Sequence, residues 1–543
     1  MERDSGWLAL IPVFFLILVF FYPLFRISID AFFVDTLPTL ATFPRILAEL
    51  SIRRALTFTL TQAAISTVFS VTVGFPLGFI LSRYLFPGKY LLKALLLLPF
   101  MTPPTIVVLG FILLYGPKGM FSSFIPQLKI LSEGFYSIIA AHVFYNAPLA
   151  AYYVFSTLKR LGPEMEEASD SLGASPYMKF LKIFLPHSLP GLLSSSILIF
   201  LYCFTSFTIP LVLGGIRYRT LEVEIYSLYK VFFDHSGAAA LSLIQFLVLG
   251  FISFTYLKFF ILRAERIEPG YGEKLREIRV MDVPPVRRFL IIAYVFLMMF
   301  FFLSPLAAVI LRSFLDVYTG RFTVKPFSAV FSSTYNPYLG TSPLNSICNT
   351  LIFSFIAALL TVFNALLASL QRSAFYSTLV NTPLMVSSIT LALGLYRAYG
   401  TNYLIYQHSW ILIVLSYTVI ALPLAHRIVS SGISRIPEEI FEAAKTLGSD
   451  DIDILLRIKL PLSWDGVFSA FLLSLALGMS EFAITLFLSR PEYSTMTVAM
   501  YRFMSSRRFQ EASCMGSLLL VLSGAIFYLG YKVGGEAYGI SEA

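Results

Sequence analysis

Long runs of apolar residues, separated by short polar segments, dominate the chain. The runs from Ala55 to Ser82 and from Phe289 to Leu311 contain no charged residue. A helix needs about 20 mostly apolar residues to cross a bilayer. The pattern predicts twelve membrane-spanning helices, over residues 7–29, 56–82, 94–115, 135–157, 191–213, 237–262, 289–311, 347–370, 377–396, 408–429, 467–488 and 511–533.

The composition agrees with a chain that lies mostly in lipid. Hydrophobic residues make up 57% of the sequence and charged residues only 13%, about half the charged share of an average soluble protein. A soluble chain with so little charge could not cover its own surface, which excludes a soluble enzyme, a disordered scaffold or a secreted module. We therefore predict an all-α polytopic membrane protein.

Basic residues indicate how the chain is oriented. More than half of the 40 Lys and Arg fall on loops that share a side with both termini, and segment 263–288 carries the largest cluster. By the positive-inside rule, both termini are expected on the cytoplasmic side of a cell membrane. The net charge of +9 does not indicate nucleic-acid binding, because basic and acidic residues are interleaved in short loops.

One motif occurs twice with the same spacing, 275 positions apart. Its members are Glu167, Ala168, Gly173, Ile183, Leu185 and Pro186 in the first copy, and Glu442, Ala443, Ala444, Gly448, Ile458, Leu460 and Pro461 in the second. Neighbouring spans keep this offset, which indicates an internal repeat. We predict a first six-span half over 1–262, a cytoplasmic linker over 263–288, and a second six-span half over 289–543.

Each copy of the motif lies in a polar loop and predicts two short helices. Prolines and glutamates suit the start of the first helix, and Gly173 and Gly448 can end it. Pro186 and Pro461 are expected to end the second helix. Such an elbow cannot bury its own apolar residues, so it either binds a partner or packs against the membrane surface. Identical spacing in both copies favours a partner.

These loops resemble the EAA loop of permeases in binding-protein-dependent ABC transporters. Ser169 replaces the second alanine in the first copy. Two EAA loops in one chain are similar to the fused permeases of the ferric-iron and thiamine importers. Segments 141–146 and 203–215 resemble the thiamine permease in particular.

The resemblance implies a division of labour among subunits. The chain would form the substrate path, a soluble binding protein would deliver substrate from outside, and two ATPase subunits would dock on the short helices after Gly173 and Gly448.

The sequence has no Gly-x-x-x-x-Gly-Lys-Ser/Thr phosphate loop and no catalytic or metal-ligand spacing. We therefore expect no catalysis, no metal and no cofactor in this chain, with ATP bound by the partners. The substrate implied is thiamine, a related cation or ferric iron.

Two other classes of function remain as alternatives. An ion-coupled secondary carrier also has repeated halves, but it has no ATPase for paired elbows to contact. A polytopic membrane enzyme is disfavoured because no catalytic constellation is recognisable.

Polar side chains within the predicted spans are candidates for the substrate path, because ionisable groups are costly there. The candidates, with two aromatic neighbours, are Glu481, Ser206, Phe207, Phe482, His142 and Asn146. The fifth and eleventh spans are repeat-related and are expected to face each other near a pseudo-two-fold axis. Alternatively, Glu481 pairs with Arg490 or Arg502, and His142 and Asn146 form hydrogen bonds between helices.

Overall fold

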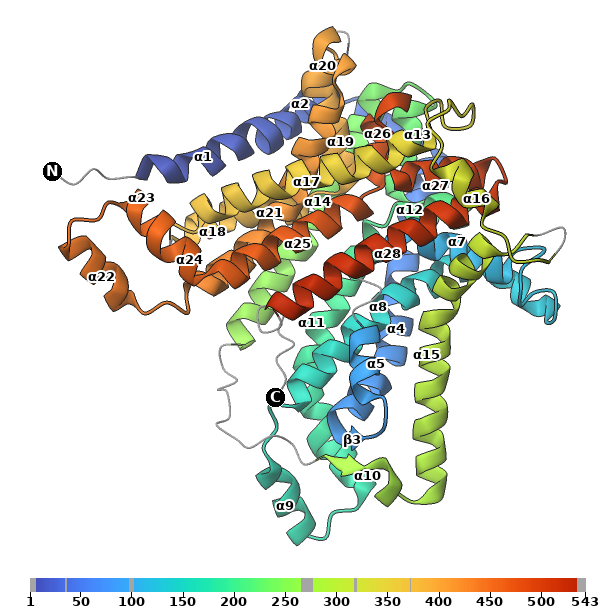
Figure 1. The fold of residues 1–543 in the computed structure, drawn as a ribbon, viewed down its shortest axis with the longest axis vertical. Coiled ribbons are helices and arrows are strands. Elements are labelled where there is room, and N and C mark those ends of the chain that lie inside the picture. Colours follow the sequence, from blue (N-terminus) through green and yellow to red (C-terminus); the bar gives the residue numbers. More distant parts are fainter. Residues whose placement is uncertain are drawn as a thin grey trace.

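The computed structural model describes residues 6–34, 37–96, 102–264, 277–316, 320–371 and 373–534. These residues form a bundle of helices with four two-residue strands (Figure 1). The predicted all-α class is confirmed.

The helices of the first half are α1 (Gly6–Leu16), η1 (Ile17–Phe21), α2 (Tyr22–Phe32), α3 (Thr42–Ala48), α4 (Leu50–Arg83), α5 (Lys89–Leu95), α7 (Pro104–Tyr115), η2 (Pro126–Leu131), α8 (Phe135–Leu158), α9 (Pro163–Ser171), α10 (Pro176–Lys179), η3 (Phe180–Phe184), α11 (Leu185–Phe204), α12 (Thr208–Leu213), α13 (Leu221–Lys230) and α14 (His235–Ala264). Strand β1 (Phe33–Val34) pairs antiparallel with β2 (Leu37–Pro38), and β3 (Tyr84–Leu85) pairs parallel with β4 (Ile278–Arg279).

The remaining helices are η4 (Val280–Asp282), α15 (Pro285–Phe314), α16 (Lys325–Val330), α17 (Pro343–Ala368), α18 (Ala374–Asn381), η5 (Thr382–Met385), α19 (Ser388–Leu395), η6 (Tyr396–Gly400), α20 (Tyr403–Gln407), α21 (Trp410–Ile433), α22 (Glu438–Thr446), α23 (Asp451–Ile454), η7 (Leu455–Lys459), α24 (Leu460–Leu462), α25 (Trp464–Ser480), α26 (Ala483–Leu488), η8 (Pro491–Tyr493), α27 (Met496–Ser505) and α28 (Phe509–Gly534).

The two halves contain the same series of helices. Helices α8 and α21 begin and end 275 positions apart, and so do α9 and α22, α10 and α23, α12 and α26, and α13 and α27. Equivalent hydrogen bonds recur: Thr59 Oγ1 accepts the N–H of Leu221 at 2.9 Å, and Thr350 Oγ1 accepts the N–H of Met496 at 2.8 Å. The repeat is therefore structural as well as sequential. The borders of the halves stay a prediction, because linker residues 265–276 lie outside the described ranges.

The first helices of each half pack against the other half. Helices α1 and α2 lie against α17 and α19, and α15 lies against α7. Arg397 Nη2 donates to Asp30 Oδ1 on α2 at 3.0 Å, and the Tyr294 hydroxyl on α15 donates to the carbonyl oxygen of Val73 on α4. The halves are thus interlocked, and Figure 1 shows their helices diverging toward α9 and α22.

Judged by length and composition, fewer than twelve helices among the described residues could cross a membrane. Among the described residues, nine helices are long and apolar enough to cross a membrane, and two bent pairs raise the number to eleven. The third predicted span contains α7, which has only 12 residues, and residues 97–101 lie outside the described ranges. The count of twelve stays a prediction.

Three predicted spans are interrupted, one of them near Pro383, and the breaks in the other two were not predicted. The segment predicted over 377–396 bends by 99°. There Ser387 Oγ accepts the N–H of Thr390 at 3.1 Å and begins a new helix. The spans predicted over 191–213 and 467–488 stop after α11 and α25 and restart as α12 and α26. A side-chain oxygen can accept a backbone N–H in place of a helical carbonyl oxygen. Glu481 Oε1 does so by accepting the N–H of Ile484 at 3.1 Å.

Candidate functional site

Both motif copies form the predicted elbow around a glycine. Gly173 has φ +68° and Gly448 has φ +86°, a left-handed conformation that glycine adopts without steric cost. The N–H of Ala174 donates to Ser169 O at 3.0 Å, which closes α9, and the equivalent bond of Ser449 closes α22. These bonds are typical of a Schellman helix end. The prediction that both glycines end a helix is confirmed.

The second helix of the first elbow does not end at Pro186, which corrects the prediction. Helix α10 continues through the π-helical turn η3 into α11, and Pro186 lies in the first turn of α11. A proline is tolerated in a first turn, and here the N–H of Leu185 donates five residues back, to Phe180. In the second elbow α24 does end one residue after Pro461, and the chain bends by 80° before α25.

The tips of both elbows expose apolar side chains at equivalent positions. Leu172 and Leu447, directly before the two glycines, are each 86% exposed. Three further exposed pairs are Met165 with Ile440, Tyr177 with Ile452, and Leu181 with Leu456. Glu167 and Glu442 are exposed among them. Exposed apolar surface with a polar rim is typical of a site for another protein.

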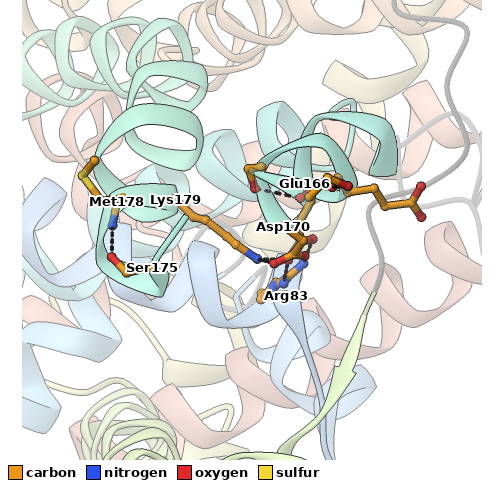
Figure 2. A network of polar contacts seen from close by, with 9 residues as sticks. Arg83, Glu166, Asp170, Ser175, Met178 and Lys179 are labelled. Carbon is orange, nitrogen blue, oxygen red and sulfur yellow. Dashed lines mark hydrogen bonds and ion pairs between the residues drawn. The ribbon is translucent and has the colours of Figure 1, made fainter. Parts of the chain in front are cut away.

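A buried network of charges holds the first elbow against the end of α4. The guanidinium of Arg83 donates to both carboxylate oxygens of Glu166 on α9, and both residues are only 7% exposed. Lys179 on α10 pairs with Asp170 and lies 3.9 Å from Glu166. Figure 2 shows these side chains converging from α4, α9 and α10. The network therefore joins the elbow to a long apolar helix.

A second group of charges involves the segment between the halves. Glu277, next to strand β4, lies 3.1 Å from Lys89 Nζ and 3.8 Å from Lys159 Nζ. Burial lowers the pKa of Lys89, and its contact with Glu277 opposes that shift. A cavity of about 610 Å³ lies between Arg83, the elbow and β4.

The second elbow is held differently. Phe441 occupies the position equivalent to Glu166 and is buried. Lys459 Nζ lies 5.4 Å from the centre of its ring, a cation–π contact. The two elbows thus share their shape and their exposed tips, but an ion pair holds one and an aromatic contact holds the other.

At the junction of the halves, four aromatic rings form a row with the symmetry of the repeat. Tyr226 lies 5.5 Å from Phe207, Phe207 lies 6.0 Å from Phe482, and Phe482 lies 5.3 Å from Tyr501, measured between ring centres. We call these four residues the aromatic quartet. The equivalent breaks after α11 and α25 therefore face each other, as the repeat predicts. Glu481 and Ser206 directly precede the two phenylalanines and are partly exposed.

The basic partners proposed for Glu481 make other contacts. Arg490 Nη2 lies 3.5 Å from Glu492 Oε1, and Arg502 Nη1 donates to the carbonyl oxygen of Leu339.

His142 and Asn146 join helices. His142 Nδ1 lies 3.0 Å from Ser66 Oγ on α4, and Asn146 Nδ2 lies 3.4 Å from Cys203 Sγ on α11. These contacts match the helix-packing alternative, and a role for this pair in the path stays a prediction.

Sequence reasoning missed several residues of these sites. The tyrosines of the quartet are 275 positions apart, so the repeat could have identified them. Arg83 and Glu166 carry no local signal for their pairing, because they are far apart in the sequence.

Comparison with known proteins gives consistent matches. The family described as binding-protein-dependent transport system inner membrane component matches residues 74–266 and 344–533. A putative ferric transport system permease protein, FbpB 1, from Haemophilus influenzae is 24% identical over 95% of this chain and 83% of its own length. The thiamine transport system permease protein ThiP from the same organism is 25% identical over 87% of this chain and 86% of its own length. A solved bacterial ABC transporter that imports alginate aligns with a TM-score of 0.41 and 17% identity over 49% of this chain and 96% of its own.

Proposed function

Because the chain belongs to the family of binding-protein-dependent transport system inner membrane components, we propose that it is the complete permease of an ATP-driven importer of a small cation. Relatives that match most of the chain carry the names of ferric and thiamine permeases, so thiamine and ferric iron are the two candidate substrates. Both termini and the linker lie in the cytoplasm in this proposal, and a binding protein delivers substrate to the opposite face.

The observation that carries the proposal is the pair of equivalent elbows. Each presents an 86% exposed leucine, at Leu172 and Leu447, beside an exposed glutamate. One ATPase subunit docks on each elbow, binds the ATP and hydrolyses it. Closure of the ATPase pair moves the elbows, and the elbows rock the two halves about the aromatic quartet. This chain contributes no catalytic group and holds no cofactor.

Purification of the chain from its native membrane tests the proposal. We expect an ATPase of different sequence to co-purify in detergent, because the two elbows expose apolar surface that a partner would bury. The control is the same chain with Leu172→Asp and Leu447→Asp, which should reach the membrane but lose the ATPase. An ion-coupled carrier would instead purify without an ATPase and transport its solute in the absence of ATP.

A further inference from the structure

A second carboxylate lies beside the junction of the halves, with part of its bonding capacity unused. Glu222 on α13 is fully buried. Its Oε1 accepts a hydrogen bond from Gln245 on α14, whereas its Oε2 has no partner among the described residues. Ser387 of the second half lies beside it, but the Ser387 hydroxyl already contacts Thr390 Oγ1 at 3.0 Å. A buried carboxylate with an unused oxygen is costly unless another group compensates it.

Glu222 and Glu481 come from opposite halves and lie at the same junction: α13 packs against α19, and α19 packs against α26, which Glu481 caps. Among the described residues, neither carboxylate forms a salt bridge with a basic side chain. Glu481 is partly exposed, and its Oε1 caps α26. Carboxylates at a junction without a basic partner keep a proton or take up a cation.

The aromatic quartet adjoins both carboxylates. Glu222 and Tyr226 are one helical turn apart on α13 and therefore share a face. Phe482 directly follows Glu481 and stacks on Phe207 of the other half. Aromatic faces attract cations, most effectively organic cations that are weakly hydrated.

We propose that Glu222, Glu481 and the aromatic quartet form a binding site for an organic cation that carries an aromatic ring. This inference rests on the proposed import function and assigns its substrate class. The carboxylates neutralise the charge, and the rings of the quartet contact the flat face of the ligand. A small, highly charged metal ion would instead need a shell of oxygen ligands.

The site is closed in this structure. The rings of Phe207 and Phe482 are 6.0 Å apart, whereas a ring inserted between them needs about 7 Å. The ligand therefore enters when the two halves move apart, and the stack re-forms behind it.

The repeat supplies matched variants for a test. Thr497 occupies the position equivalent to Glu222, and Ser206 occupies the position equivalent to Glu481. Glu222→Thr and Glu481→Ser thus install side chains that the fold already accommodates in its other half. Glu222→Gln and Glu481→Gln remove the charge and keep the shape.

The experiment uses the whole importer, reconstituted in vesicles with its ATPase subunits and binding protein, and measures uptake of thiamine and of Fe³⁺ separately. We expect ATP-driven thiamine uptake in the wild type, and about ten-fold slower uptake in each single variant, because each loses a charged contact with the cation. ATPase recruitment should stay unchanged. The control is Glu492→Gln, an exposed carboxylate on η8, which should transport normally.

Two results would overturn the inference and leave the import function standing. One is thiamine uptake at the wild-type rate in Glu222→Gln and Glu481→Gln. The other is ATP-driven uptake of Fe³⁺ without uptake of thiamine. If Glu222→Gln fails to fold, thiamine uptake by Glu222→Thr and Glu481→Gln decides whether the inference stands. Absence of ATPase recruitment by the wild type would instead overturn the proposed function itself.

Discussion

Replacing Glu167 and Glu442 together by lysine is expected to abolish ATP-driven transport while the chain still inserts into the membrane. Both carboxylates are exposed, one on each elbow, next to the apolar tips. In the proposed complex they face the ATPase subunits, and juxtaposing like charges at an interface costs several kcal/mol. A loss of binding free energy of this size at both elbows should leave little bound ATPase, since each 1.4 kcal/mol weakens binding ten-fold. The measurements are ATP-driven uptake and the amount of ATPase that co-purifies with each permease variant.

Charge reversal at the opposite face provides the control for this double variant. Glu133 and Glu492 are exposed acidic residues in loops remote from the elbows, and reversing both should leave ATPase recruitment intact. Transport at the wild-type rate in Glu167→Lys with Glu442→Lys would show that the elbows do not couple the chain to ATP hydrolysis.

Replacing Arg83 by alanine is expected to destabilise the first elbow by about 3–5 kcal/mol, because it leaves Glu166 buried without its main partner. The effect should be local, because the elbow projects from the bundle and the core of the halves is built from other helices. Limited proteolysis after Lys179 measures it, because this side chain is only 13% exposed while α10 is docked and becomes accessible when α10 detaches. In the second elbow, Lys459→Ala removes the cation–π contact with Phe441, and a contact of this kind is worth about 1–2 kcal/mol.

The second elbow also suggests a double substitution that should restore the stability lost in Arg83→Ala. Arg83→Leu with Glu166→Phe installs an apolar contact where the second half carries Phe441. Replacing both members of a buried ion pair by apolar residues is often neutral or stabilising. The double variant should therefore resist proteolysis nearly as well as the wild type. Equal cleavage of the single and double variants would mean that the Arg83–Glu166 pair does not hold the elbow.

The elbows were predictable from the sequence because their signals are local. A glycine six residues after the last glutamate of a cluster, with a proline before the cluster, encodes a helix start and a helix end without any tertiary information. The motif also occurs twice, so each copy supports the other. The two glycines that end the first helix of each elbow could be located to the residue for the same reason.

The repeat predicts that the fifth and eleventh spans face each other, but the detailed contacts at this junction are tertiary, and the sequence pattern does not reveal them. The run around Glu481 is apolar enough for a continuous helix, yet the side chain caps α26 instead and the helix breaks. The position of Glu222 at this junction is set by the packing of α13 against α19, across the two halves. The continuation of α10 through Pro186 depends on a π-helical turn that no residue pattern marks.

The mass of the purified complex tests the central claim most directly. Native mass spectrometry of the detergent-solubilised assembly should give one copy of this chain with two ATPase subunits, because one chain carries both elbows. A complex with two copies of this chain, or with a single ATPase per chain, would contradict the account.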